Sequence, residues 1–298
     1  MAEAAAEQAG TEPTAPRWHA IAVLLVGACI IGLSPILVRL TEAGSAAAGF
    51  WRFFFAMPLL ALVSVRATGG LGKPSRLAAW AGVFFALDLG FWHYGIHYTS
   101  VTNATVLSNL TPVAVVVFSW LFLKQRPKAL FLVAVAASVG GAWLMAFEKG
   151  GGGLKNQPLG DLLSLFTALW YSLYFLTMGE ARKTESTSRL MFWVSVVGSP
   201  LILVAALLLG ERLFPTSPGG WAALVGLGLM HVTGQGSIAW AMGRLPTSTA
   251  SVVVLIQPIV AAWLGWALFA EPIGPLQGLG AAITLGGVVL AQWASRKS

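Results

Sequence analysis

The feature that most constrains this chain is a series of ten apolar runs, separated by short polar turns. A run of about 18 or more apolar residues is long enough to cross a bilayer as a helix. The alternating segments of about ten residues that mark a transmembrane barrel are not the pattern here. We therefore predict an all-α integral membrane protein with ten transmembrane helices. The predicted spans are His19–Leu40, Ala46–Val65, Leu77–His97, Thr102–Leu123, Leu130–Phe147, Leu159–Met178, Leu190–Leu209, Trp221–Met242, Ser248–Phe269 and Leu276–Trp293.

Composition agrees with this reading, because 57% of the residues are hydrophobic and 10% are charged. A typical soluble domain carries about 25% charged residues. The first segment, 1–16, is short, polar and rich in Ala, Glu, Thr and Pro, and we expect it to be a disordered cytoplasmic tail. Cys29 is the single cysteine, so no internal disulfide is expected.

The basic residues predict the orientation of the spans. If the loops are assigned alternately to two sides, thirteen of the 18 Lys and Arg residues fall on one side and four on the other. Short loops rich in Lys and Arg stay in the cytoplasm. Both termini are therefore expected in the cytoplasm, and the net charge of +7 is explained by topology without a nucleic-acid partner.

An internal repeat relates the two parts of the chain. Aligned without gaps at an offset of 146, residues 102–146 and 248–292 share nine identities, among them a proline, a tryptophan and a Gly-Gly pair. Proline and glycine have positional meaning in helices, which gives these matches weight. The matched residues include Pro112 with Pro258, Trp120 with Trp266, and Gly140–Gly141 with Gly286–Gly287.

We therefore expect two five-helix repeats, residues 17–150 and 151–298. Five is an odd number, so the second repeat must start on the opposite side of the membrane and be inverted relative to the first. Inverted repeats are typical of secondary transporters, whose substrate site lies near the midplane between the halves. The alternative interpretation is a duplicated helical bundle with no role in transport.

Three segments carry a family resemblance: "FWRFFFAMPLLAL", "HYTSVTNATVLSNLTPVAVVVFSWLFL" and "LPTSTASVVVLIQPIVAAWLGWALFAEPIGPLQGLGAAITLGGVVL". With these, nearly the whole chain after Arg17 resembles the drug/metabolite transporter superfamily, in its ten-helix EamA branch. More narrowly, it is similar to the YddG type of aromatic amino-acid exporter. The resemblance implies export of metabolites. The chain departs from the family pattern at Gln125, where many relatives carry Glu.

The candidate substrate-binding residues are polar or aromatic side chains well inside the predicted spans. Such groups usually face the protein interior or a water-filled cavity, and aromatic walls can stack on an apolar or aromatic ligand. Hydrogen bonding between helices and ordinary packing are the alternatives for each of them. The candidates are His93, Asn109, Trp170, Tyr171, Tyr174, Gln235 and Gln257.

Two charged residues, Arg52 and Asp88, lie well inside the spans, away from their ends. Arg52 could pair with Asp161, since both lie towards the outer side. Asp88 is either a proton-coupling acid or a structural hydrogen-bond acceptor, and the second reading is favoured. His93 and His97 have the i, i+4 spacing of a zinc pair, but the motif lacks its glutamate and a third ligand, so we expect no metal.

These patterns predict a transporter of small amphipathic metabolites, most of all amino acids including aromatic ones, by alternating access. Export of other metabolites or drugs, such as purines or cationic compounds, is the first alternative, and a membrane-embedded enzyme the second. We find no nucleophile–base pair and no Gly-rich phosphate loop, so neither an enzyme nor a cofactor is expected. The expected partners are a small-molecule substrate and the lipid of a bacterial inner membrane, and a monomer is compatible with the sequence.

Overall fold

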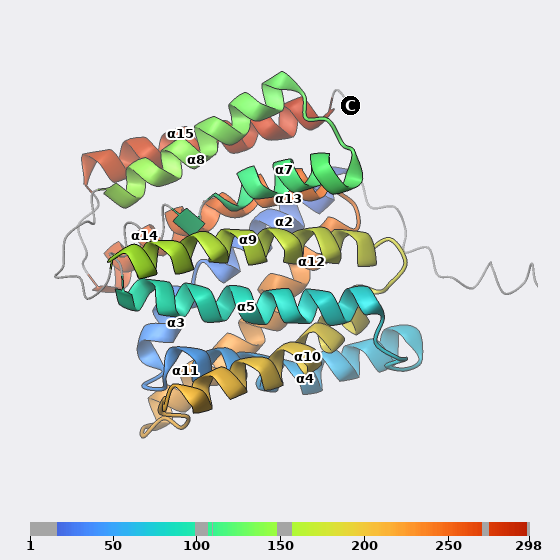
Figure 1. Ribbon diagram of the computed structural model, residues 1–298, viewed down its shortest axis with the longest axis vertical. Helices are drawn as coiled ribbons and strands as arrows, with labels where there is room; N and C mark the ends of the chain where they lie inside the picture. Colours follow the sequence, from blue (N-terminus) through green and yellow to red (C-terminus); the bar gives the residue numbers. More distant parts are fainter. Residues whose placement is uncertain (1–16, 99–106, 109, 148–156, 270–273, 297–298) are drawn as a thin grey trace, which may run out of the picture.

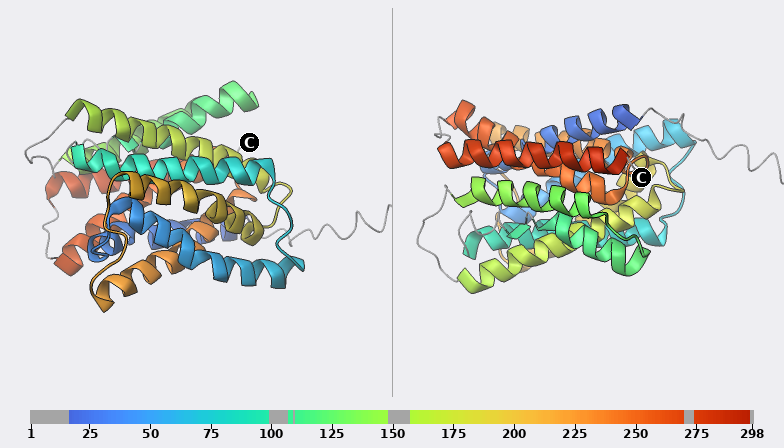
Figure 2. Two further views of the ribbon diagram at one scale, coloured as in Figure 1. Left: turned by 60° about the horizontal axis from the view of Figure 1, so that its bottom comes forward. Right: turned by 90° about the horizontal axis from the view of Figure 1, so that it is seen from above.

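The computed structural model describes residues 17–98, 107–108, 110–147, 157–269 and 274–296, and all regular structure in these ranges is helical. The predicted all-α class is therefore confirmed for the part of the chain described. The long helices lie side by side in one bundle (Figures 1 and 2). The helices are α2 (Arg17–Ile31), α3 (Ser34–Leu40), α4 (Ser45–Thr68), α5 (Arg76–Tyr98), α7 (Thr111–Leu123), α8 (Ala129–Phe147), α9 (Gln157–Ala181), α10 (Thr187–Leu208), α11 (Pro218–Met230), the π-helix η1 (His231–Gln235), α12 (Gly236–Met242), α13 (Thr247–Val253), the 3₁₀-helix η2 (Val254–Ile256), α14 (Gln257–Phe269) and α15 (Pro275–Arg296).

Six helical segments in the described ranges are long and apolar enough to cross a membrane. Shorter apolar helices accompany them at Thr111–Leu123, Ala129–Leu144 and Gly278–Ala291. The predicted count of ten spans stays a prediction. The six segments are Trp18–Val38, Ser45–Thr68, Pro158–Ala181, Thr187–Leu208, Pro218–Met242 and Thr247–Leu268.

Large apolar side chains cover the outside of the bundle. Leu208 is 81% exposed, Val289 69% and Phe122 66%. Contiguous apolar surface of this kind marks contact with lipid or with another protein. Together with the apolar helices it identifies a multi-pass membrane protein.

Proline lies at a break in one helical segment and in the first turn of another helix. The 3₁₀ turn Val254–Ile256 interrupts the segment from α13 to α14 directly before Gln257 and Pro258. A proline removes a backbone donor and frees a carbonyl about one turn earlier. The break expected from the sequence near Pro258 is therefore present. Helix α7 likewise has Pro112 in its first turn.

Helices α8 and α15 pack against each other through small residues (green and red, top of Figure 1). A Cβ atom added to Gly141 would come within 3 Å of Thr284, and one added to Gly287 would come within 3 Å of Ser138. Gly141 and Gly287 are 146 positions apart, and so are Ser138 and Thr284. The two contacts are therefore reciprocal, as in an interface related by a two-fold axis.

The two ends of the bundle are tied by loops from opposite halves of the chain. We call one end the Glu42 end, where residues 41–44 meet residues 209–217, and the other the Glu185 end, where residues 68–75 meet residues 182–193. Trp51 Nε1 donates to the carbonyl oxygen of Leu213 over 2.7 Å at the first, and Trp193 Nε1 to that of Leu71 over 3.0 Å at the second. The Glu42 end is on the left of Figure 1.

Candidate functional site

Polar side chains from several helices meet in the interior of the bundle. Arg52 comes from α4, Asp88 from α5, and His231 and Gln235 from the two ends of the π-helix η1. Arg52 is 5% exposed, Asp88 7%, and the other two at most 1%. Polar and ionisable side chains at membrane depth are costly and usually functional. We call these four residues the central polar cluster.

A chain of hydrogen bonds fixes the state of His231. Arg52 Nε donates to His231 Nδ1 over 3.4 Å, and Ser195 Oγ lies 3.2 Å from His231 Nε2. Ser195 Oγ also donates to the carbonyl oxygen of Met191 over 2.8 Å. Because Nδ1 accepts from Arg52, the ring proton of a neutral imidazole lies on Nε2 and is donated to Ser195. A neutral His231 therefore holds the Arg52 side chain in place.

The π-helix η1 explains why these groups meet. Its five residues form one turn with i to i+5 hydrogen bonds inside an otherwise α-helical segment. Such a bulge inserts an extra residue and is frequent at functional sites. It places both His231 and Gln235 on buried positions of the bundle.

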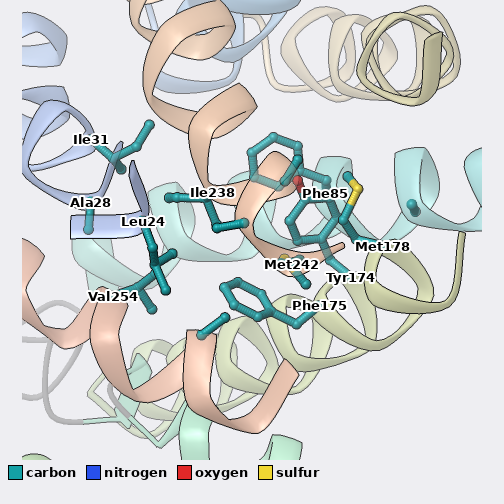
Figure 3. Close-up of a cluster of buried hydrophobic side chains, with 14 of the residues drawn as sticks. Leu24, Ala28, Ile31, Phe85, Tyr174, Phe175, Met178, Ile238, Met242 and Val254 are labelled. Carbon is teal, nitrogen blue, oxygen red and sulfur yellow. The ribbon is translucent and has the colours of Figure 1, made fainter. Parts of the chain in front are cut away.

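Aromatic rings line the central polar cluster. Phe85 stacks on Tyr174, with ring centroids 4.6 Å apart, and on His231, at 5.6 Å. Tyr174 accepts a hydrogen bond from Gln235 Nε2 over 3.0 Å and stacks on Tyr171. Figure 3 shows Phe85 and Tyr174 beside each other at one side of the buried side chains. These rings offer an apolar wall beside buried hydrogen-bonding groups.

Arg52 and Asp88 form no ion pair with any residue in the described ranges. The predicted pairing of Arg52 with Asp161 is therefore wrong. The physical reason is packing, since α4 contacts α10, α11 and α5, which directs Arg52 towards His231 and over the Phe85 ring, 5.5 Å from its centroid.

The structure places the other predicted site residues in three ways. Tyr171, Tyr174 and Gln235 lie together at the cluster. Trp170 packs instead against Phe84, Phe91 and Phe166, and its Nε1 is buried without a partner in the described part of the chain. Gln257 Nε2 is likewise buried and unpartnered there. Asn109 and the side chain of His93 lie outside what the structure describes.

Sequence reasoning did not include Arg52, Asp88 or His231 among the site residues. A charged residue inside an apolar run was visible for the first two, and that signal was assigned to structure. His231 is also a polar side chain inside a predicted span, four residues before Gln235, but a histidine within an apolar helix is compatible with simple packing, and it was left out of the site. In the described residues, no three His, Cys, Asp or Glu side chains gather as metal ligands would.

A cavity of about 350 Å³ opens at the Glu185 end, away from the central polar cluster. It lies between the ends of α7, α8, α13 and α15, beside basic and hydroxyl side chains. Ser119 Oγ, on its wall, is buried and has no partner among the described residues. The lining residues are Val116, Ser119, Gln125, Arg126, Pro127, Lys128, Phe131, Pro246, Ser248, Thr249 and Ala294.

Two carboxylates fasten the Glu42 end. Glu42 Oε2 accepts hydrogen bonds from the backbone N–H of Ser217 and from the backbone N–H and hydroxyl of Thr216. Hydrogen bonds from Ser217 and Thr216 lower the pKa of Glu42 to about 2. Glu211, from the opposite loop, accepts from the N–H of Ala47 and the hydroxyl of Tyr94. Each loop thus caps a helix of the other half.

Comparison with protein families gives two matches. The model of the EamA-like transporter family matches twice, over residues 18–147 and 158–293. The model of solute carrier family 35 matches residues 93–214. The first model therefore covers most of the chain, and it does so with one match in each half.

Individual relatives are distant but extensive. An uncharacterized transporter of Archaeoglobus fulgidus is 26% identical, over 91% of this chain and 95% of the relative. The pseudopaline exporter CntI of Pseudomonas aeruginosa is 21% identical over 64% and 65%, and the GDP-mannose transporter GONST5 of Arabidopsis thaliana 23% over 70% and 64%. A solved crystal structure with 14% identity superposes with a TM-score of 0.80 over 95% of this chain and all of that one.

Proposed function

Because the chain belongs to the EamA-like transporter family, we propose that it exports small amphipathic metabolites, above all amino acids including aromatic ones. The central polar cluster carries this proposal. It combines a buried arginine, a buried aspartate and neutral hydrogen-bonding groups with the rings of Phe85, Tyr171 and Tyr174. That combination suits a small ligand with an apolar body and a polar head.

We propose further that the two halves are inverted repeats which alternate in opening around this cluster. The two matches of the family model, one in each half, support this. So do the reciprocal contacts of α8 with α15, because they are antiparallel: Gly141 meets Thr284, while Gly287 meets Ser138. A two-fold axis that relates antiparallel helices in this way lies across them, in the plane of the membrane.

The orientation belongs to the same proposal. The Glu185 end carries most of the basic loop residues, so it faces the cytoplasm of a bacterial cell and the Glu42 end faces outward. The cavity at the Glu185 end would then be an opening on the cytoplasmic side. An exporter loads its substrate from that side.

Nucleotide sugars are the second candidate cargo, because one relative is named a GDP-mannose transporter. A diphosphate requires several cationic or donor groups around it. Of the four residues in the central polar cluster, Arg52 is the only cation, and the cluster also contains the carboxylate of Asp88. This favours a cargo without net charge.

Counterflow into proteoliposomes tests the proposal. Purified protein is reconstituted with unlabelled cargo inside, and uptake of labelled phenylalanine, tryptophan, threonine and GDP-mannose is followed. We expect phenylalanine and tryptophan to exchange fastest. Preferred exchange of GDP-mannose, or no exchange of any amino acid, would contradict the amino-acid assignment. A Glu180→Gln variant, at a surface ion pair with Lys183, is the matched control and should behave as wild type.

A further inference from the structure

We propose that Arg52 and Asp88 form a divided site for a zwitterion, in which Arg52 binds the carboxylate of the substrate and Asp88 its ammonium group. The inference rests on the proposed transport of amino acids and names the residues that would recognise the two charges. It assigns a binding role to two side chains that the sequence patterns alone favoured as structural.

The first support is the orientation of the Arg52 guanidinium. Its Nε is occupied by His231, whereas Nη1 and Nη2 have no partner among the described residues. Arginine and carboxylate pair through two parallel N–H···O bonds, and the Nη1–Nη2 edge offers that fork. A buried arginine that is held at one nitrogen and open at the other two is arranged to receive an oxyanion. His231 therefore acts as a positioning residue for Arg52.

The second support is the position of Asp88. It follows Phe85 by three residues on α5, so the two side chains are neighbours on the helix surface, about 5–6 Å apart at Cβ. The ring of Phe85 is also the one over which Arg52 lies. Asp88 has no hydrogen-bond partner in the described ranges, and its side chain is buried, with 7% exposed to solvent. An unpaired buried carboxylate is costly, and an ammonium group would pair with it.

The third support is charge balance. One guanidinium and one carboxylate give the site no net charge, and a zwitterion keeps the total at zero when it binds. A monoanion or a monocation would leave one buried protein charge uncompensated. Around the pair, the groups from α9, α10 and η1 are neutral donors and acceptors: Tyr171, Tyr174, Ser195, Gln235 and His231, whose hydrogen bonds require the uncharged ring. The site thus discriminates by the sum of charges.

The test measures binding of three ligands that share one phenyl group: phenylalanine, 3-phenylpropanoate, which lacks the amine, and phenethylamine, which lacks the carboxylate. Dissociation constants are measured by calorimetry on purified full-length protein in detergent, so that membrane permeation of the amine does not interfere. Wild type should bind phenylalanine best. Asp88→Asn should shift the preference towards 3-phenylpropanoate by at least about tenfold, since one charge-assisted contact is lost.

Arg52→Gln should shift the preference in the opposite direction, towards phenethylamine. Opposite shifts in the two variants are the signature of a divided site. Equal weakening of all three ligands in both variants would show a structural role and overturn the inference. Should either variant fail to elute as a folded species, Asp88→Glu and Arg52→Lys keep the charges, and each should still prefer phenylalanine. Loss of that preference in them would also contradict the site.

Wild-type binding of threonine separates this inference from the proposed function. Binding and exchange of threonine without phenylalanine would contradict the aromatic preference and leave the zwitterion site standing. Exchange of phenylalanine with unchanged ligand preference in Asp88→Asn and Arg52→Gln would contradict the zwitterion site and leave the proposed transport of aromatic amino acids standing. Failure of wild type to bind either amino acid would overturn both.

Discussion

At the Glu42 end, Trp51 donates to a loop carbonyl of the other half, and at the Glu185 end Trp193 does the same. The donors are 142 positions apart, and so are their acceptors, Leu71 and Leu213. The helix caps also correspond, because Ser75 accepts from the N–H of Ala78 and Ser217 from that of Gly220. The two ends therefore have the same tryptophan hydrogen bond and the same serine helix cap at equivalent positions.

The surroundings of the two tryptophans differ. In the described part of the chain, Trp193 has a ring contact with Phe192, whereas Trp51 lies in a cluster of aromatic rings from three segments. The Glu42 end has two capping carboxylates, and the Glu185 end has the cavity. The aromatic neighbours of Trp51 are Phe50, Phe54, Phe55, Phe214 and Trp221.

The comparison shows that equivalent hydrogen bonds lie in unequal surroundings at the two ends. The Glu42 end is fastened by packing as well as by hydrogen bonds, and opening it must separate a cluster of rings. The Glu185 end is held chiefly by hydrogen bonds from loops. Among the described residues, the cavity of about 350 Å³ lies at the second end, between α7, α8, α13 and α15.

The largest expected effect tests which end faces outward. In a Cys29→Ser background, a single cysteine replaces Gly219 at the Glu42 end or Gly70 at the Glu185 end. Both positions accept a side chain, because a Cβ at Gly70 meets nothing within 4 Å and one at Gly219 meets Ser217 Oγ at 3.6 Å. In intact cells an impermeant thiol reagent should label the first and spare the second. The opposite pattern would reverse the proposed orientation.

The next largest effect concerns the difference in packing around Trp51 and Trp193. Trp51→Ala should lower the free energy of unfolding by about 3 kcal/mol, since it removes a large packed ring together with a hydrogen bond. Trp193→Ala should cost about half as much, because fewer rings surround it. Thermal and denaturant unfolding of the purified variants in detergent measure the difference. Equal costs would show that the aromatic cluster adds nothing to the Glu42 end.

A smaller change isolates the shared hydrogen bond. Trp51→Phe and Trp193→Phe keep an aromatic ring and remove the Nε1 donor, so each should cost about 1 kcal/mol. Here the two ends should respond alike. A clear inequality between the phenylalanine variants, measured by the same unfolding assay, would mean that the hydrogen bonds themselves differ in strength.

The smallest effect is a pH dependence confined to the Glu42 end. The folded-state pKa of Glu42 is about 2, below the ordinary value of 4.5, so its hydrogen bonds stabilise the fold above pH 4.5. This contribution declines as the pH falls from about 4.5 to about 2. Acid should therefore expose the loop of residues 211–217 to protease before the loop at the other end. In Glu42→Gln this selective acid sensitivity should disappear.

Much of the scaffold followed from the sequence. Apolar runs predicted the helices, because backbone groups in lipid must be satisfied internally. Gly141 and Gly287 were matched by the repeat, and they lie where a side chain would collide with the facing helix. The break at Pro258 follows from its missing N–H group.

The central polar cluster could be predicted from the sequence only in part. Tyr174 and Gln235 were identified as polar groups inside spans, but the bond of Arg52 to His231 joins residues 179 positions apart. No local pattern encodes such a pairing. The π-helix between His231 and Gln235 has no local signature either, because it reflects how the surrounding helices pack.

The two offsets between the halves have a consequence for the symmetry of the site. In the first part of each half, equivalent positions are 142 residues apart, as for Ser75 and Ser217, and in the last part they are 146 apart, as for Ser138 and Thr284. In the first register, Arg52 corresponds to Val194 and Asp88 to Met230, so neither charge has a counterpart. If the halves are inverted repeats, as proposed, the site between them is asymmetric, and a zwitterion bound there would have one orientation rather than two.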